Sequence, residues 1–395
     1  MRRKTPHKYN EHIESLRRNM EDNTEITTKE RILADFKRLL QQEWNIPSYA
    51  DMLSVGHTRD AIRHHYGNIS KLSQIAREDG DANVVYISEL GKSKSVAEST
   101  KKTFIITTAV ANASVHVDFM KAMETYCEAR DAEIVVMLCE SKTNSFQNES
   151  AIFDPILSTS PNISIVKTDT PLNSNLFLCS IQVSANQIRP ITGLSRIGAR
   201  EGSYIFAAPK QFLEYTPTAN TGKNYTIMTT GACTTPKYFD VKSFVSKRLA
   251  YIADYDQTMG AIVVEIVDED KFHFRQIQMS GDGSFVDLGT RYNPDGTIEE
   301  NIETTLILGD IHGVSVDQGN LQDFINDFGD FNIEMVVLHD TFDGLSISHH
   351  IKEPGEKAGR NLTSLEEEVD VTFGVIQYIN NSFTPTEGVT VVKSN

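Results

Sequence analysis

The segment Thr304-Thr305-Leu306-Ile307-Leu308-Gly309-Asp310-Ile311-His312-Gly313 contains an apolar run that leads directly into two polar residues. Those residues, Asp310 and His312, belong to types that bind metal ions, and they stand one residue apart. Side chains alternate between the two faces of a strand, so both would project to the same side and could share one cation. Carboxylate and imidazole together suit Mn, Fe or Zn. The segment therefore predicts a strand that ends in two metal ligands.

The same arrangement recurs further along the chain. The segment Met335-Val336-Val337-Leu338-His339-Asp340-Thr341-Phe342-Asp343-Gly344 again leads from apolar residues to carboxylates, and Val389-Thr390-Val391-Val392-Lys393-Ser394-Asn395 leads to an amide. Open α/β sheets place their sites at the carboxyl ends of strands. For either of the first two segments alone, a turn aspartate and an ordinary surface histidine explain the sequence equally well. Their recurrence favours a metal site.

The residues of these segments resemble motifs of a known family. Gly309-Asp310-Ile311-His312-Gly313 is similar to G-D-x-H-G, the first motif of calcineurin-like metallophosphoesterases. The second motif, G-D-x-x-D, is matched by Asp340 and Asp343, with His339 in place of its glycine. Asp340-Thr341-Phe342-Asp343 resembles D-L-F-D or D-L-F-H, the form of this motif in the family's DNA exonuclease branch. Gly344 stands where the phosphatases carry a phosphate-binding arginine, which counts against a phosphatase.

The resemblance implies a metal-dependent nuclease that hydrolyses DNA phosphodiesters with two divalent metal ions. The expected ion is Mn²⁺, with Mg²⁺, Fe²⁺ or Zn²⁺ as alternatives. The implied metal ligands are Asp310, His312, Asp340 and Asn395, and the catalytic candidates are Asp343, His349 and His350. Neighbouring histidines point in different directions, so at most one of the two is expected to serve.

The resemblance covers residues 296–395 and only the first half of the family's domain. The family's general-acid histidine would follow Asn395. We therefore expect a C-terminally truncated chain that binds metal weakly and does not cleave DNA by itself. A non-catalytic DNA-binding or scaffold protein with a vestigial half-site is the alternative, and a phosphatase or small-nucleotide phosphodiesterase is a third reading.

Residues 26–80 predict a helix-turn-helix-like unit. Thr27 and Glu30 form a capping box, and apolar residues follow at helical spacing. A glycine turn at Gly56 and a helix over 58–67 have the form of a DNA-reading pair of helices. The unit resembles helical repeats attached to phage and homing endonucleases. The residues expected to face DNA are Arg59, Arg63 and His64, whereas a dimerisation or packing unit remains the alternative.

Residues 102–295 predict a central α/β domain. Phe104–Val110 and 133–139 are nearly continuous apolar runs around a helix that we expect to start at Ser114, which suits a sheet covered on both faces. Basic residues including Lys247 and Arg248 are interpreted as ordinary surface, although a phosphate track is the alternative. The order of the domains, with Phe104–Val110 and Asp340–His350, is similar to early nucleases with which some siphophages degrade host DNA.

Composition sets further limits on the 395-residue chain. Its net charge is −16, and residues 295–370 alone carry 18 Asp and Glu against three Lys and Arg, which fits cation binding. A solvated acidic face is the alternative, and it is our interpretation of Glu366-Glu367-Glu368. The basic tail 1–25 is followed by no apolar segment typical of a secretory signal, and no membrane span is expected. The four cysteines show no C-x-x-C spacing and are expected to be reduced core residues. We expect a cytoplasmic homo-oligomer whose partner is DNA.

The predicted fold class is α/β. It comprises the helix-turn-helix unit, the central α/β domain and, in 296–395, the first half of a metallophosphoesterase β-sandwich flanked by helices.

Overall fold

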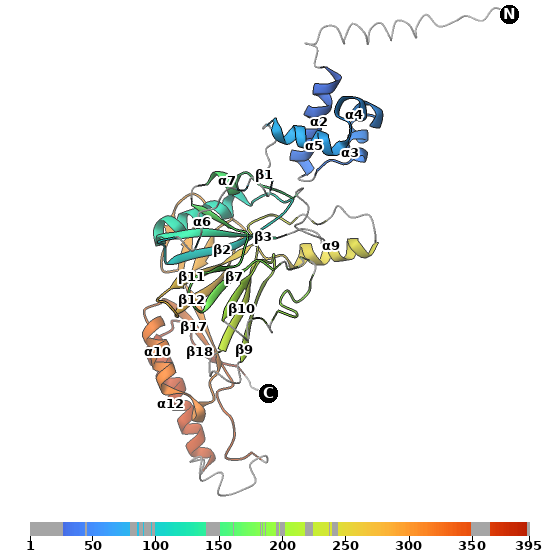
Figure 1. Ribbon diagram of the computed structural model, residues 1–395. Coiled ribbons are helices and arrows are strands. Elements are labelled where there is room, and N and C mark those ends of the chain that lie inside the picture. Colours follow the sequence, from blue (N-terminus) through green and yellow to red (C-terminus); the bar gives the residue numbers. More distant parts are fainter. Residues whose placement is uncertain are drawn as a thin grey trace, which may run out of the picture. The chain divides into compact units, whose positions relative to one another are not determined.

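The chain is seen in a computed structural model (Figure 1). It describes residues 27–43, 46–79, 85–86, 90, 96, 99–139, 151–160, 162–181, 183, 185, 187–194, 197, 202–217, 224–236, 238, 244–348 and 364–392. The chain divides into two compact units, Met1–Met279 and Ser280–Asn395. Both units combine helices with strands, so the fold is α/β, as the sequence predicts. This division lies before the boundary that the sequence predicted, between residues 295 and 296, because residues 285–299 form a small sheet of the second unit.

The first unit begins with a bundle of short helices. Its caps follow from the sequence: Thr27 Oγ1 accepts from the Glu30 backbone N–H at 3.3 Å, and a Glu30 carboxylate oxygen accepts from the Thr27 N–H at 2.8 Å. Gly56 (φ +93°) supplies the turn between the second and third helices. A core that includes Phe36 and Ile62 joins them. The helices are α2 (Thr28–Glu43), α3 (Tyr49–Ser54), α4 (Arg59–Tyr66) and α5 (Ile69–Glu78).

Two five-stranded sheets form the rest of the first unit. One has the order β12-β11-β2-β3-β5, with β2, β3 and β5 parallel. Its strands are β2 (Thr103–Val110), β3 (Ala132–Cys139), β5 (Ile163–Val166), β11 (Gly260–Ile266) and β12 (Phe272–Gln278). The other has the order β6-β7-β8-β10-β9. Its strands are β6 (Thr170–Pro171), β7 (Leu176–Cys179), β8 (Ser203–Phe206), β9 (Gln211–Pro217) and β10 (Asn224–Thr230).

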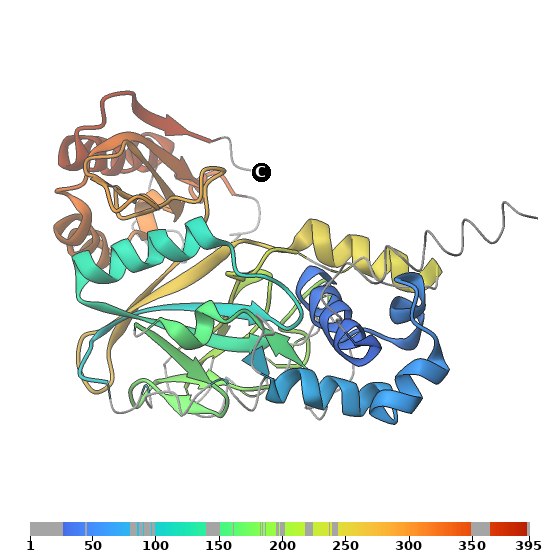
Figure 2. The ribbon, with the colours of Figure 1, turned by 90° about the horizontal axis from the view of Figure 1, so that it is seen from above.

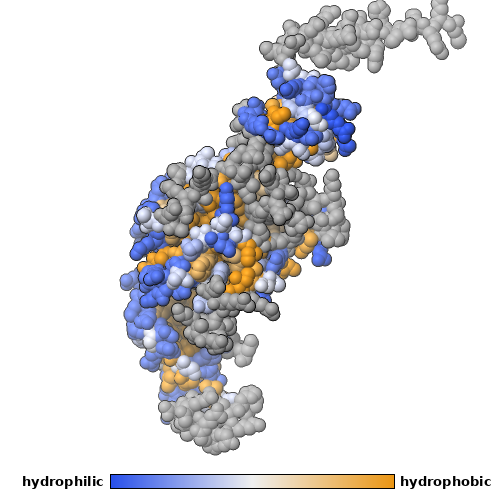
Figure 3. Space-filling view, in the orientation of Figure 1, coloured by the Kyte–Doolittle hydropathy of each residue, from blue (hydrophilic) through white to orange (hydrophobic). Residues whose placement is uncertain are grey.

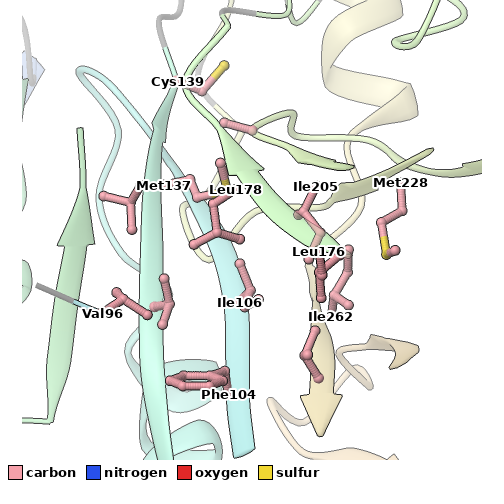
Figure 4. Packing of buried hydrophobic residues seen from close by; sticks show 14 residues of the cluster. Val96, Phe104, Ile106, Met137, Cys139, Leu176, Leu178, Ile205, Met228 and Ile262 are labelled. Atoms are coloured by element: carbon pink, nitrogen blue, oxygen red, sulfur yellow. The ribbon is translucent and has the colours of Figure 1, made fainter. Parts of the chain in front are cut away.

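The main core of this unit draws on both sheets. Phe104, Ile106 and Met137 from the first sheet belong to one buried cluster with Leu178 and Ile205 from the second (Figure 4). β2 is buried along nearly its whole length, and its mostly apolar sequence suits a strand that is covered on both faces.

Two longer helices accompany these sheets. The helix α6 (Val117–Arg130) begins after His116, whose Nδ1 accepts from the Phe119 N–H at 3.2 Å. It therefore starts three residues after Ser114, the expected first residue. The other long helix is α9 (Phe244–Asp256). The remaining short elements are β1 (Val85–Tyr86), which pairs with β4 (Ile152–Phe153), and α7 (Ile156–Thr159).

The second unit contains two three-stranded sheets. The small antiparallel sheet consists of β13 (Phe285–Asp287), β14 (Thr290–Tyr292) and β15 (Ile298–Glu299). The other sheet is parallel, in the order β16-β17-β18. Its strands are β16 (Thr304–Asp310), β17 (Ile333–His339) and β18 (Gly388–Val391). They alternate with η2 (Gly313–Ser315), α10 (Gln318–Phe328) and α12 (Leu365–Phe383).

Both long helices of the second unit cover the same face of the parallel sheet (Figures 1 and 2). Leu308 and Leu338 pack there against Phe324 from α10 and Phe383 from α12. On β16 the intervening residues are exposed, among them Ile307 at 65%. Apolar side chains are exposed on α12 as well, and Figure 3 shows hydrophobic surface over its N-terminal part. This sheet is therefore much less enclosed than the central one.

All four cysteines, Cys127, Cys139, Cys179 and Cys233, are buried and none forms a disulfide, as the sequence predicts. None of the helices in the described ranges combines the length and the apolar character that a bilayer crossing needs.

Candidate metal centre

The candidate site lies at the carboxyl ends of β16 and β17. These strands pair in parallel, and a register shift between Leu308 and Asp310 brings Asp310 opposite His339. Backbone hydrogen bonds continue beyond the strands: the His312 N–H donates to the Asp340 carbonyl at 2.8 Å. The loops that follow the two strands therefore run side by side and bring the two predicted segments together.

Two residues of these loops have a backbone conformation that L-amino acids seldom adopt. His312 has φ +47° and Asp340 has φ +43°. This left-handed region costs on the order of 1–3 kcal/mol for a residue other than glycine, and such outliers cluster at functional sites. The sequence gives no sign of this left-handed conformation, because the alternation of a regular strand would simply continue from Asp310 to His312.

His312 and Asp343 are in direct contact. The Nδ1 atom of His312 hydrogen-bonds to Oδ1 of Asp343. That hydrogen bond and the charge of Asp343, with smaller effects from Asp310 and Asp340, raise the pKa of His312 above its usual value, although burial opposes the change. The sequence proposed Asp343 as a catalytic group; the structure places it as the partner of a predicted ligand.

The carboxylates of the site have few partners among the described residues. The second carboxylate oxygen of Asp343, Oδ2, is buried and accepts no hydrogen bond from the described residues. Within the same part of the chain, no lysine or arginine forms an ion pair with Asp310, Asp340 or Asp343. Buried polar groups are normally satisfied, and an exception calls for an explanation such as an ion.

The arrangement is not a finished metal site. In the described ranges, no three His, Cys, Asp or Glu side chains come together in a way that could hold an ion. Asn395, His349 and His350, which were also predicted to belong to the site, lie outside the residues described. The structure thus brings Asp310, at the end of β16, near the two neighbouring loops that hold His312, Asp340 and Asp343, without joining the four side chains around one point.

Glu368 on α12 holds one of these loops. Its carboxylate accepts hydrogen bonds from the Leu345 N–H at 2.8 Å, the Ser346 N–H at 3.0 Å and the Ser346 hydroxyl at 2.6 Å. The side chain is 2% exposed. Burial by itself would raise the pKa of Glu368, but hydrogen bonds from Ser346, Leu345 and Gly344 outweigh it and keep that pKa below its usual value.

The next turn of α12 lies against the other loop. A side chain at Gly313 would place its Cβ 2.7 Å from Thr372 Oγ1 and 2.9 Å from Thr372 Cα. Thr372 itself donates to the Glu368 backbone carbonyl at 2.9 Å. One helix therefore contacts both loops of the candidate site. Sequence reasoning interpreted Glu366-Glu367-Glu368 as a solvated acidic face, which is wrong for Glu368.

The predicted DNA-contacting residues lie on α4. Arg59, Arg63 and His64 are all exposed. The guanidinium of Arg59 lies 5.5 Å from the centre of the Tyr49 ring. Thr58 caps the helix, with its side chain accepting from the Ala61 N–H at 3.1 Å. The described residues leave these basic groups exposed, so a ligand could reach them.

Comparison with known proteins places the chain near a phage protein. No protein-family model matches the chain. It is 25% identical over 313 residues to Protein A1 of Escherichia phage T5. The matched region covers 74% of this chain and 54% of Protein A1, so the chain spans about half the length of this relative. The chain is therefore related in sequence to a phage protein.

Proposed function

We propose that the protein is a metal-dependent phosphodiesterase that acts on DNA. The observation that carries this proposal is the pairing of β16 and β17, which sets Asp310 at the end of β16 beside the loops that hold His312, Asp340 and Asp343. No lysine or arginine among the described residues pairs with these carboxylates, and the His312 ring pairs only with that of Asp343. Oxygen and imidazole donors with uncompensated negative charge suit a divalent cation such as Mn²⁺.

The His312–Asp343 contact supports the same proposal. A histidine that ligates a metal commonly donates its other ring N–H to a carboxylate, which fixes the tautomer and the orientation of the ring. Asp343 would accept such a hydrogen bond from the N–H at Nδ1, which leaves Nε2 of His312 to bind a metal ion. Since no three-ligand group exists in the described part of the chain, binding would involve a rearrangement of side chains.

Divalent ions, when bound, would supply an activated water and stabilise charge on the phosphate oxygens. The residues of the chain have separate tasks. Asp310, His312 and Asp340 would hold the ions, and Asp343 keeps the His312 ring oriented. Glu368 fixes the loop that follows Asp343 through three hydrogen bonds.

The first test replaces Asp340 by alanine. We expect Mn²⁺ binding in calorimetry to weaken by at least about tenfold, with loss of any Mn²⁺-dependent cleavage of duplex DNA in a gel assay. Glu367→Ala, on the exposed side of α12, is the matched control and should change neither quantity. Equal Mn²⁺ affinity in wild type and Asp340→Ala would contradict the metal site.

The second test concerns DNA. Replacing Arg59 and Arg63 by alanine should weaken duplex binding and reduce the slope of log K against log salt by about 1.8, since each phosphate contact contributes about 0.9. Lys71→Ala, an exposed change on α5, is the control and should leave the slope unaltered. If the slope of the double variant equals that of wild type, the helical unit is a packing module.

A second candidate function is a DNA-binding protein with an incomplete site. It is favoured by the lack of a three-ligand group in the residues described. Duplex binding that depends on Arg59 and Arg63, without hydrolysis of DNA in Mn²⁺, would support it. Hydrolysis of a small aryl phosphodiester without DNA cleavage would instead favour a small-nucleotide phosphodiesterase.

A further inference from the structure

The helix α9 buries small residues and exposes large ones. A surface helix normally buries its large apolar side chains and exposes polar ones. On α9 the small residues Ala250 and Ala253 are buried, in a cluster that includes Val110. The large residues face solvent: Tyr251 is 63% and Tyr255 is 90% exposed. Large parts of both aromatic rings are therefore accessible to a ligand.

Exposed and half-buried residues of α9 form two rows along the helix. Positions four apart lie on the same side of a helix. One row is Lys247, Tyr251 and Tyr255, and the other is Arg248, Ile252 and Asp256. Together these six residues line a hollow of about 600 Å³. Figure 1 shows α9 extending past the strands of its unit, so that a long ligand could follow the helix.

The charge of this surface is opposite to that of the chain. Asp256 is neutralised by Lys210, whose Nζ lies 2.8 Å from Asp256 Oδ2. Lys247 and Arg248 form no ion pair with a residue that the structure describes. The two rows therefore present two uncompensated cations, whereas the whole chain has a net charge of −16.

We propose that the α9 surface, formed by Lys247, Arg248, Tyr251 and Tyr255, binds single-stranded nucleic acid. Aromatic rings on which bases stack, next to cations that meet the phosphates, are the two elements of such sites. Among the described residues that line the hollow, only Ile252 is aliphatic, and the cations Lys247 and Arg248 favour a polyanion over a partner helix. The proposal rests on the proposed DNA-cleaving function and extends it by naming the form of nucleic acid that α9 of the first unit binds.

The test measures binding by the full chain in EDTA, so that it does not depend on the metal site. The ligand is a fluorescein-labelled thymidine oligonucleotide of about 20 nucleotides, followed by anisotropy. Tyr255→Ala should weaken binding about tenfold and Tyr251→Ala/Tyr255→Ala further, since stacking on each ring contributes separately. Tyr255→Phe keeps the ring and should bind as wild type does. Tyr215→Ala, which removes another tyrosine that is 61% exposed, is the matched control.

Two further measurements separate the contribution of the cations from that of the aromatic rings. Lys247→Ala/Arg248→Ala should reduce the salt slope by about 1.4, since single-strand contacts contribute about 0.7 each. An abasic oligonucleotide should bind wild type and Tyr255→Ala equally, because it offers phosphates without bases. Unchanged oligonucleotide affinity in the double tyrosine variant, or no binding by wild type, would overturn the proposal.

The outcomes also distinguish this proposal from the proposed function. Loss of oligonucleotide binding in the tyrosine variants, without Mn²⁺-dependent cleavage by wild type, would uphold the α9 surface and reject the nuclease. Cleavage that is insensitive to Tyr251 and Tyr255, with unchanged binding, would do the reverse. If the double variant dissociates an oligomer in sedimentation but binds the oligonucleotide normally, the surface joins copies of the chain and the proposal fails.

Discussion

Two aspartates, one in each unit of the protein, differ in how their carboxylates are satisfied. In the first unit, the buried Asp154 follows β4, and its carboxylate accepts from the Val115 N–H at 3.0 Å and the Ile156 N–H at 3.1 Å. In the second unit, the Asp343 carboxylate has an oxygen without a described partner. The first carboxylate is therefore used within the fold, whereas the second keeps an oxygen atom that a ligand could use.

The largest expected effect separates the two units by stability. Ile106 on β2 is fully buried and Ile307 on β16 is mostly exposed. Ile106→Ala removes buried methylene and methyl groups and should lower the free energy of unfolding by about 2–5 kcal/mol, whereas Ile307→Ala should stay within about 0.5 kcal/mol. Urea denaturation followed by circular dichroism measures both. Equal losses would mean that the outer face of the C-terminal sheet is covered in solution.

An intermediate effect concerns how α12 holds the candidate site. Glu368→Ala leaves the Leu345 and Ser346 N–H groups without their acceptor, which should cost about 1–3 kcal/mol of unfolding free energy. We also expect Mn²⁺ binding to weaken by about tenfold, because an outer group that orients a ligand is lost. Glu368→Gln retains an acceptor oxygen and should restore part of the affinity. If Glu367→Ala weakens Mn²⁺ binding as much, the effect belongs to overall charge and not to the hydrogen bonds.

The smallest effect is a pH dependence at His312. The pKa of His312 is raised in the folded protein, so its pairing with Asp343 stabilises the fold at pH values below the unfolded-state pKa. This stabilisation is lost as the pH rises through the folded-state pKa. Mn²⁺ needs the neutral ring, so its affinity should fall as pH drops below the raised pKa. Asp343→Asn should move this fall to lower pH, as calorimetric titrations over the range from about pH 6 to 8 would measure. A midpoint unaffected by Asp343→Asn would remove the assigned role of the contact.

Local patterns explain the parts that the sequence predicts. Thr27 and Glu30 form the expected cap because the capping box depends only on residues three apart. The strands that end near Asp310 and His339 were likewise predictable from uninterrupted apolar runs. The pairing within the sheet β6-β7-β8-β10-β9 was not, because strand partners such as β7 and β8 lie far apart along the chain.

The role of Glu368 could have been suspected from helical spacing. The buried residues of α12 are Glu368, Thr372, Ile379 and Phe383, which follow the period of one helix face. A count of charges treats three successive glutamates alike, whereas helical geometry turns only one of them inward. The left-handed conformation of Asp340 leaves no such sign, because it depends on the course of the neighbouring loop.

The positive φ angles of His312 and Asp340 bear on how the chain would change in evolution. Glycine adopts this conformation without strain, so Asp340→Gly would relieve the backbone while removing a proposed ligand. Selection for folding alone would then favour a residue that selection for activity forbids, the trade-off expected where function opposes stability. In descendants released from selection for catalysis, position 340 should therefore be among the first of the site to drift, and toward glycine.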